Sequence, residues 1–284
     1  MSTLPSSGES PLPWSPPILR WAGSKRKLVP TLMTNAPASY ERYIEAFAGS
    51  ACLLFALHPK NAVLNDINEQ LIESYSVLRD HPRLLARGVH ALPNTKREYY
   101  RQRSLDTSTL QPLDRAIRFI YLNRNCFNGV YRTNRQGVFN VPRGKKTGSI
   151  PTEQEFYRCS VALRDTDLRA LDFENCLADV KKGDFVYLDP PYSTSSRPRY
   201  GEYGYASFQP IDVTRLVGVL RMLDQRGAYF LLSYAGGESV KRSFSEWNCQ
   251  SIRVRRHVAG FVDHRTVVDE ILVSNYSSAE GSGE

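Results

Sequence analysis

The string LDPPY at residues 188–192 places a carboxylate, two prolines and an aromatic ring after an apolar segment. Prolines cannot continue the hydrogen-bond ladder of a strand, and they fix φ. Asp189 and a backbone carbonyl aimed by Pro190 and Pro191 could therefore accept both hydrogens of an exocyclic amino group. Tyr192 could stack on the base that carries this group. An ordinary turn at the end of a strand is the alternative.

The 6-amino group of adenine suits such acceptors. Its lone pair is delocalised into the ring, so it is a poor nucleophile, and two acceptors would draw the nitrogen toward tetrahedral geometry. Catalysis would then depend mainly on positioning and electrostatics rather than on a strong base. A base in a duplex would have to leave the helix to reach such a site.

A turn and an acid upstream could hold an adenosine-containing ligand. The segment EAFAGSACLL (45–54) predicts a strand, a turn with Phe47 and Gly49, and a helix start, so a ligand could approach backbone N–H groups. Asp66 ends the next predicted strand, where it could bind ribose hydroxyls or cap a helix. The full G-x-G-x-x-G pattern and a Walker lysine are absent, which disfavours NAD and ATP.

Near the start of the chain, LRWAGSKRKL (19–28) predicts a turn followed by a helix. Ser24 could cap this helix, and Lys25 could bind a carboxylate or a phosphate. The alternative is a capped helix with solvated lysines.

Charge is distributed unevenly. The chain has 284 residues and a formal net charge of +8, which favours a polyanionic partner. Residues 115–152 contain no Asp or Glu. They contain basic and aromatic residues around NRQGVFN, which predicts a hairpin tip. This stretch is typical of a nucleic-acid-binding element, since arginine can read guanine bidentately.

Elements that position these residues alternate between strands and helices. Strands are predicted at 42–50, 62–68, 168–173, 184–192 and 227–234, and two antiparallel strands follow near the end. We expect an α/β fold with a doubly wound, mostly parallel sheet. Residues 69–150 break the pattern and predict a mainly helical insertion. The Ser- and Pro-rich segment 1–17 and the segment 277–284 predict flexible tails.

Other sequence features exclude several classes of protein. Five scattered cysteines without a C-x-x-C pair argue against a disulfide framework or structural zinc. Apolar runs are too short to span a membrane, and no signal peptide is evident. We expect a reduced, cytoplasmic, soluble protein without a metal.

Taken together, the segments LRWAGSKRKL, EAFAGSACLL, LNDIN, YLNRNCFNGVYRTNRQGVFNVPRG, LDPPY and VRRHVAGFVDHRTVVDEIL resemble the Dam-type DNA adenine-N6 methyltransferases. The resemblance implies a Rossmann-like seven-stranded catalytic domain, formed by 18–68 and 151–276, with a target-recognition domain at 69–150. It implies transfer from S-adenosylmethionine to duplex DNA without a metal, by a monomer or a weak dimer. The hairpin favours a GATC-like site.

Individual residues acquire roles from this resemblance. The implied catalytic residues are Asp189, Pro190, Pro191 and Tyr192. The implied cofactor contacts are Trp21, Lys25, Phe47, Gly49, Asp66, Asp172, Phe173 and Asp189. The implied DNA contacts are Arg20, Arg124, Phe127, Asn128, Arg132, Asn134 and Arg143. A loop with Tyr200, Tyr203 and Phe208 would close on the flipped base.

Three departures from the family pattern remove no group that the chemistry needs. The turn reads F-A-G-S-A rather than F-x-G-x-G, Ser24 replaces a second glycine, and Phe127 replaces a tyrosine. Two rival hypotheses are an RNA or other amino-methyltransferase and a DNA-binding regulator without catalysis. The basic hairpin disfavours the first, and Asp66 with the intact LDPPY string disfavours the second.

Overall fold

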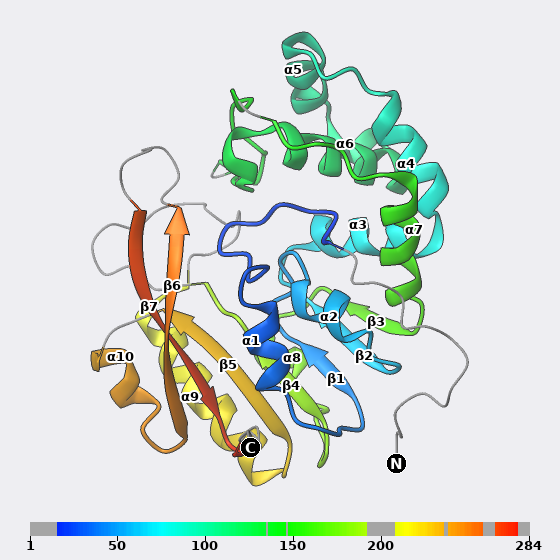
Figure 1. Ribbon diagram of the computed structural model, residues 1–284. Helices are drawn as coiled ribbons and strands as arrows, with labels where there is room; N and C mark the ends of the chain where they lie inside the picture. Colours follow the sequence, from blue (N-terminus) through cyan, green and yellow to red (C-terminus); the bar gives the residue numbers. More distant parts are fainter. Residues whose placement is uncertain are drawn as a thin grey trace, which may run out of the picture.

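One sheet organises the chain in the computed structural model, which describes residues 16–134, 136–145, 147–191, 208–235, 238–257 and 265–277 (Figure 1). Within these residues the strand order is β3-β2-β1-β4-β5-β7-β6. The strands are β1 Tyr43–Glu45, β2 Ala62–Asn65, β3 Thr166–Arg169, β4 Phe185–Leu188, β5 Tyr229–Ala235, β6 Asn248–His257 and β7 Arg265–Ser274.

Strand directions confirm the expected fold class. Strands β1 to β5 pair in parallel, whereas β7 pairs antiparallel to both β5 and β6. The expected antiparallel pair at the end of the chain is therefore present. The expected third strand is displaced, since β3 ends at Arg169 and not at residue 173. Leu171 instead donates its backbone N–H to Asn65, and Asp172 caps a short helix.

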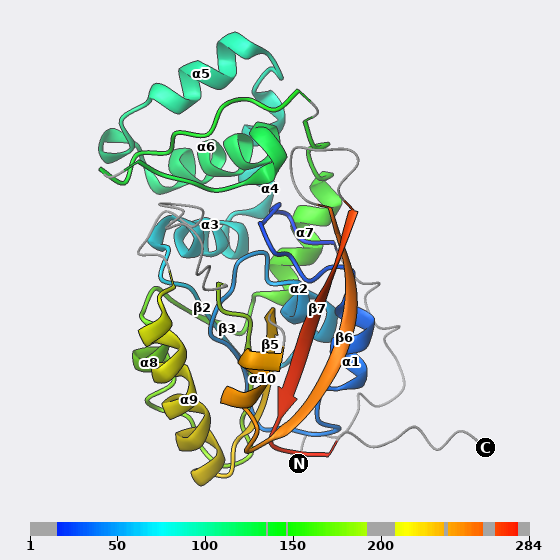
Figure 2. The ribbon, with the colours of Figure 1, turned by 90° about the vertical axis from the view of Figure 1, so that its left-hand side faces the viewer.

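Side-chain alternation divides the core between the two faces of the sheet. Tyr43 and Tyr187 belong to one buried cluster, and their neighbours Ile44 and Val186 belong to the other. Helices α1, α2 and α7 cover the first face, and α8 and α9 cover the second (Figure 2). The helices of this layered part are α1 Val29–Thr34, α2 Cys52–Leu57, α7 Glu153–Ala162, α8 Phe173–Cys176, α9 Pro210–Gln225 and α10 Glu238–Ser243.

A helical unit follows β2 and precedes α7. It consists of α3 Glu69–Asp80, α4 Pro82–Ala91, α5 Lys96–Ser104 and α6 Pro112–Asn125, with 3₁₀ turns at Thr107–Thr109 and Phe127–Gly129. Helix α6 packs against α3, α4 and α5. Helix α3 also reaches the sheet, because Tyr75 donates its hydroxyl to the Gly49 carbonyl at 2.7 Å. The helical unit thus contacts the turn after β1 directly.

Candidate active site

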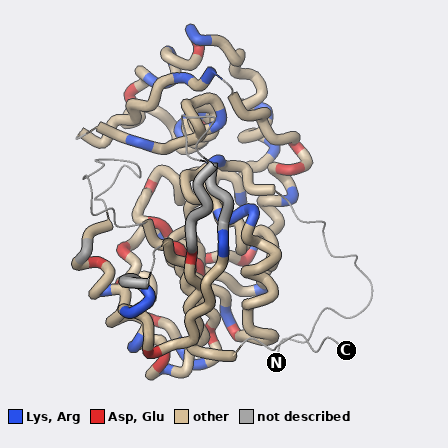
Figure 3. The backbone as a smooth tube through the Cα atoms, turned by 60° about the vertical axis from the view of Figure 1, so that its left-hand side comes forward, with Lys and Arg blue, Asp and Glu red and all other residues tan. Residues whose placement is uncertain are grey.

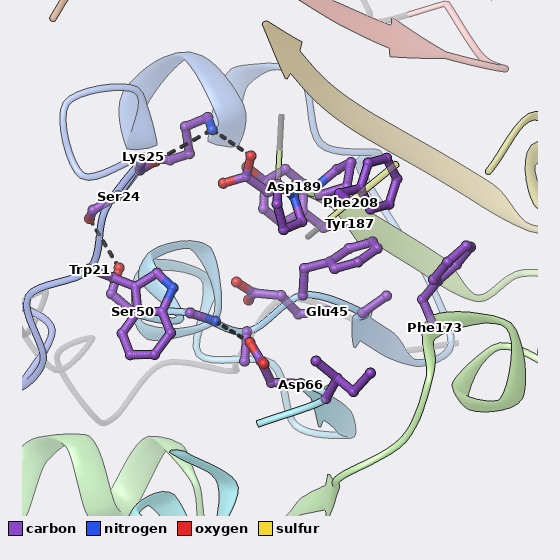
Figure 4. Close-up of a pocket in the computed structure, with 18 of the residues that line it drawn as sticks. Trp21, Ser24, Lys25, Glu45, Ser50, Asp66, Phe173, Tyr187, Asp189 and Phe208 are labelled. Atoms are coloured by element: carbon purple, nitrogen blue, oxygen red, sulfur yellow. Dashed lines mark hydrogen bonds and ion pairs between the residues drawn. The ribbon is translucent and has the colours of Figure 1, made fainter. Parts of the chain in front are cut away.

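A pocket opens at the carboxyl ends of β1, β2 and β4, where ligands of open parallel sheets usually bind (Figure 4). It brings together most of the residues that sequence reasoning assigned to a cofactor and a reacting base. Its lining includes Trp21, Lys25, Glu45, Phe47, Gly49, Asp66, Asp172, Phe173, Asp189, Pro190, Pro191 and Phe208. Tyr192, Tyr200 and Tyr203 lie outside the described residues.

Asp189 follows β4 directly and lies against a buried lysine. Lys25 donates from Nζ to Asp189 Oδ1, and Ser233 Oγ donates to the same oxygen at 3.1 Å. Glu270 on β7 is also close, with Oε2 3.9 Å from Lys25 Nζ. Burial raises the pKa of Asp189, and the charge of Lys25 opposes this rise. Lys25 therefore binds a carboxylate, one of the two partners that its sequence context suggested.

Ser24 does not cap the following helix. Its hydroxyl accepts from Ser50 Oγ at 3.0 Å and lies 3.2 Å from Cys52 Sγ. The helix begins only at Val29, with Pro30 in its first turn. Ser24 thus ties the segment before Lys25 to the turn after β1.

The turn after β1 needs a glycine at position 49. Gly49 has φ +46°, and a Cβ there would lie 2.8 Å from Trp21 Cδ1. Its N–H donates to Asp66 Oδ2 at 3.0 Å, while Asn68 N–H donates to Asp66 Oδ1. Asn68, rather than Asp66, caps α3 through Leu71 N–H. The helix-cap alternative for Asp66 is therefore wrong.

Aromatic rings form another wall of the pocket. Phe47 lies 5.4 Å from Phe173 and 6.3 Å from Phe208 between ring centroids. Ile67 and Leu171 also line the pocket, and they expose 50% and 41% of their surface. Such apolar side chains are available to the faces of a planar ring.

Sequence reasoning missed Glu45 at the end of β1. It is buried and accepts from Tyr43 Oη at 2.7 Å and from Leu54 N–H at 3.2 Å, both at Oε2. Burial raises the pKa of Glu45 to about 8, although these hydrogen bonds lower it. The signal that could have found it is an acid inside the apolar run YIEAF, because a buried acid is rarely a packing residue.

Most of the residues expected to contact a nucleic acid follow α6 in the chain. Arg132 donates from Nε to Asn140 Oδ1 at 2.9 Å, and the isolated bridge Thr133–Phe139 closes the segment around residue 136. Asn134 uses its Oδ1 to accept N–H groups of residues 136 and 138, so it builds the tip. Phe127 exposes 43% of its surface beside Asn128, which has φ +55°.

Three other arginines of this group lie close to backbone carbonyls or glycines. Arg124 donates to Ser149 O, and burial lowers its pKa to about 10. Arg143 donates to Asn94. The Arg20 side chain packs against Gly129 and Gly148. Figure 3 shows Lys and Arg recurring along this helical unit.

The family model for D12 class N6 adenine-specific DNA methyltransferases matches residues 21–258. The chain belongs to this family. The D12-class chain is 32% identical over 272 residues to the type II methyltransferase M1.LlaDCHI of Lactococcus lactis subsp. cremoris, covering 92% of this chain and 96% of the relative. It is 31% identical to the type II methyltransferase M.MjaIII of Methanocaldococcus jannaschii over 92% and 99% of the two chains. It is 28% identical to a DNA adenine methylase of Serratia marcescens over 90% and 96%.

Membership in the D12 class confirms the expected enzyme, an adenine-specific DNA methyltransferase, and DNA is its partner. Neither rival hypothesis is favoured by these relatives. Within the described ranges, no group of three or more His, Cys, Asp or Glu side chains is arranged to hold a metal. None of the helices in those ranges is both long and apolar enough to cross a membrane.

Proposed function

We propose that this methyltransferase transfers a methyl group from S-adenosylmethionine to N6 of an adenine that has left a DNA duplex, within a GATC-like site. The observation that carries the proposal is a shared pocket. Asp189, with acceptors for an amino group, lines the same cavity as Asp66 and Phe173, which suit an adenosine. A base and a methyl donor could therefore meet there.

The lining residues fit S-adenosylmethionine. Asp66 is already oriented by two backbone N–H groups, and its acceptor oxygens suit ribose hydroxyls. The rings of Phe47 and Phe173 would hold the adenine, and Trp21 and Lys25 would lie toward the methionine part. When bound, S-adenosylmethionine supplies a methyl group on a sulfonium, whose leaving thioether is neutral. The residues that hold it need no metal for this role.

Asp189 and the prolines would act by position. Asp189 accepts one hydrogen of the amino group, and a carbonyl aimed by Pro190 and Pro191 accepts the other. Lys25 favours the charged form of Asp189 and so preserves it as an acceptor. Tyr192 would stack on the base.

We propose that 69–150 recognises the DNA and that 18–68 with 151–276 carries out the transfer. Arg132 would read a guanine. Its Nε donates to Asn140, and its two terminal guanidinium nitrogens could donate together to the guanine edge. Phe127, partly exposed beside Asn128, would fill the space that the adenine leaves. Asn134, Arg20, Arg124 and Arg143 would support contacts with the backbone or the site. We expect a monomer or a weak dimer on DNA.

Methyl transfer from a labelled donor would test the proposal. The substrates are a GATC duplex, duplexes with one base pair changed, and RNA of the same sequence. We expect label in adenine N6 of the GATC duplex, with loss for each changed duplex and for the RNA. Equal labelling of RNA would overturn the DNA substrate, and a different preferred duplex would overturn only the site. Sedimentation of the protein with and without the duplex would test the oligomeric state.

A further inference from the structure

Arg215, on α9, joins three carboxylates at the edge of the pocket. It donates to Asp172 Oδ1 at 2.7 Å, to Glu174 Oε2 at 2.8 Å and to Asp212 Oδ1 at 2.9 Å. Its Cζ also lies 4.7 Å from the centroid of the Phe173 ring. One side chain therefore contacts Phe173, which the proposed function places beside the adenine of the methyl donor, and Asp172, which the resemblance assigns to the cofactor.

The contacts come from two elements that are distant in sequence. Asp172 caps α8 and Phe173 begins it, while Arg215 and Asp212 lie near the start of α9. The two helices lie side by side on one face of the sheet (Figure 2). A single exposed ion pair holds geometry weakly, but a guanidinium fork with several acceptors and an aromatic ring holds a defined position.

The two oxygens of Asp172 differ in their surroundings. Glu174 N–H and Arg215 both donate to Oδ1. Oδ2 accepts no hydrogen bond from any residue that the structure describes. An ionised carboxylate oxygen only accepts, so Oδ2 would favour a 6-amino purine, a donor, over a 6-oxo purine, an acceptor.

We propose that Arg215 is a positioning residue of the adenine subsite. It fixes Asp172 so that Oδ2 faces the pocket, and it supports the Phe173 ring from the side. The pocket thereby selects an adenosine over an inosine. This inference rests on the proposed use of S-adenosylmethionine, because it concerns the purine of that ligand.

Calorimetric binding of S-adenosylhomocysteine and of its 6-oxo counterpart, S-inosylhomocysteine, tests this role without turnover. The variants are Arg215→Met and Arg215→Lys. The control is Arg221→Met on the same helix, since Arg221 pairs with Glu246 outside the pocket lining. We expect Arg215→Met to weaken the binding of S-adenosylhomocysteine about tenfold, which corresponds to the loss of one hydrogen bond to a charged group. The preference for the 6-amino ligand should shrink by a similar factor, and Arg221→Met should leave both unchanged.

Each outcome separates this role from others. Equal weakening of both ligands, with the preference intact, would mean that Arg215 is only structural and would overturn the inference. If Arg215→Met bound both ligands with wild-type affinity, the inference would also be overturned. Arg215→Lys keeps the charge and should show a smaller loss, so it replaces Arg215→Met if that variant does not fold. Absence of S-adenosylhomocysteine binding by the wild-type protein would instead overturn the proposed cofactor.

Discussion

The indole of Trp21 stacks on the ring of Tyr131, with 5.7 Å between centroids and 15° between planes. Trp21 also lies over Gly49 in the turn after β1. Tyr131 precedes Arg132, which we propose reads a guanine. One aromatic pair thus connects the side of the pocket that we propose holds the cofactor with the segment that would recognise DNA.

Replacing Tyr131 tests this connection. Tyr131→Leu should destabilise the protein by about 1–3 kcal/mol, since Tyr131 also contacts Phe119 and Phe139 and each aromatic pair contributes about 0.5–1.5 kcal/mol. Binding of S-adenosylhomocysteine should weaken as well, because Trp21 loses its support. Urea unfolding and calorimetry measure the two effects. Tyr131→Phe keeps the stack and should bind nearly as the wild type; an equal loss in both variants would rule out the stack as the cause.

Gly49→Ala should destabilise the fold and impair cofactor binding. A side chain at φ +46° costs about 1–2 kcal/mol, and the new Cβ would push Trp21 away. Gly218→Ala is a matched control, because Gly218 lies within α9 and a Cβ there would meet nothing within 4 Å. It should stabilise the protein by about 0.5–1 kcal/mol. Urea midpoints that move in the same direction for both variants would contradict the role of the turn.

Glu45 should make stability depend on pH. Its pKa in the folded protein is about 8, above its ordinary value of 4.5, so the folded state binds one more proton between these values. The stabilisation from this group is present below about pH 4.5 and is lost as pH rises toward 8. Glu45→Gln resembles the protonated form, so its stability should fall less over this range. Unfolding free energies at pH 5, 6, 7 and 8 give the difference between the two proteins, and parallel curves would refute the assignment.

Asp189→Asn should slow methyl transfer about 10²–10³-fold while preserving the shape of the side chain. It replaces an acceptor with a group that can present an N–H to the amino group, and loss of one such contact costs about 10²–10³-fold in rate. DNA binding in a mobility-shift assay should remain close to wild type. Ser233→Ala removes a second donor to Asp189 and should reduce the rate much less. Loss of DNA binding by a folded Asp189→Asn protein would count against the proposed role.

Arg132→Ala should relax discrimination at one guanine by about 1–3 kcal/mol. Transfer rates on duplexes changed at each position of the site would show which base pair loses its influence. Arg101→Ala is the control, because Arg101 is an exposed arginine of the same helical unit that pairs with Glu98. It should leave the preference profile unchanged. The same profile for Arg132→Ala and wild type would exclude Arg132 as the reader.

Sequence patterns predicted the sheet and most of the pocket because both depend on local features. Apolar strands followed by Gly49, Asp66 and Asp189 can be read directly, and parallel strand ends meet at one edge. Ion pairs between distant residues cannot be read in this way. Arg215 was missed for this reason, since only folding brings it to Asp172 and Glu174. Glu45 was missed although it had a local signal, because the acid inside the apolar run YIEAF was interpreted only as part of a strand.

The order of synthesis gives a further meaning to the ion pair between Lys25 and Asp189. The lysine leaves the ribosome 164 residues before its partner, and the helical unit is made between them. Glu270, which lies on β7 and close to Lys25, is synthesised later still. A nascent chain can therefore complete the helices that we propose recognise DNA long before it can complete the proposed reaction centre. A fragment that ends before β4 contains Lys25 without Asp189.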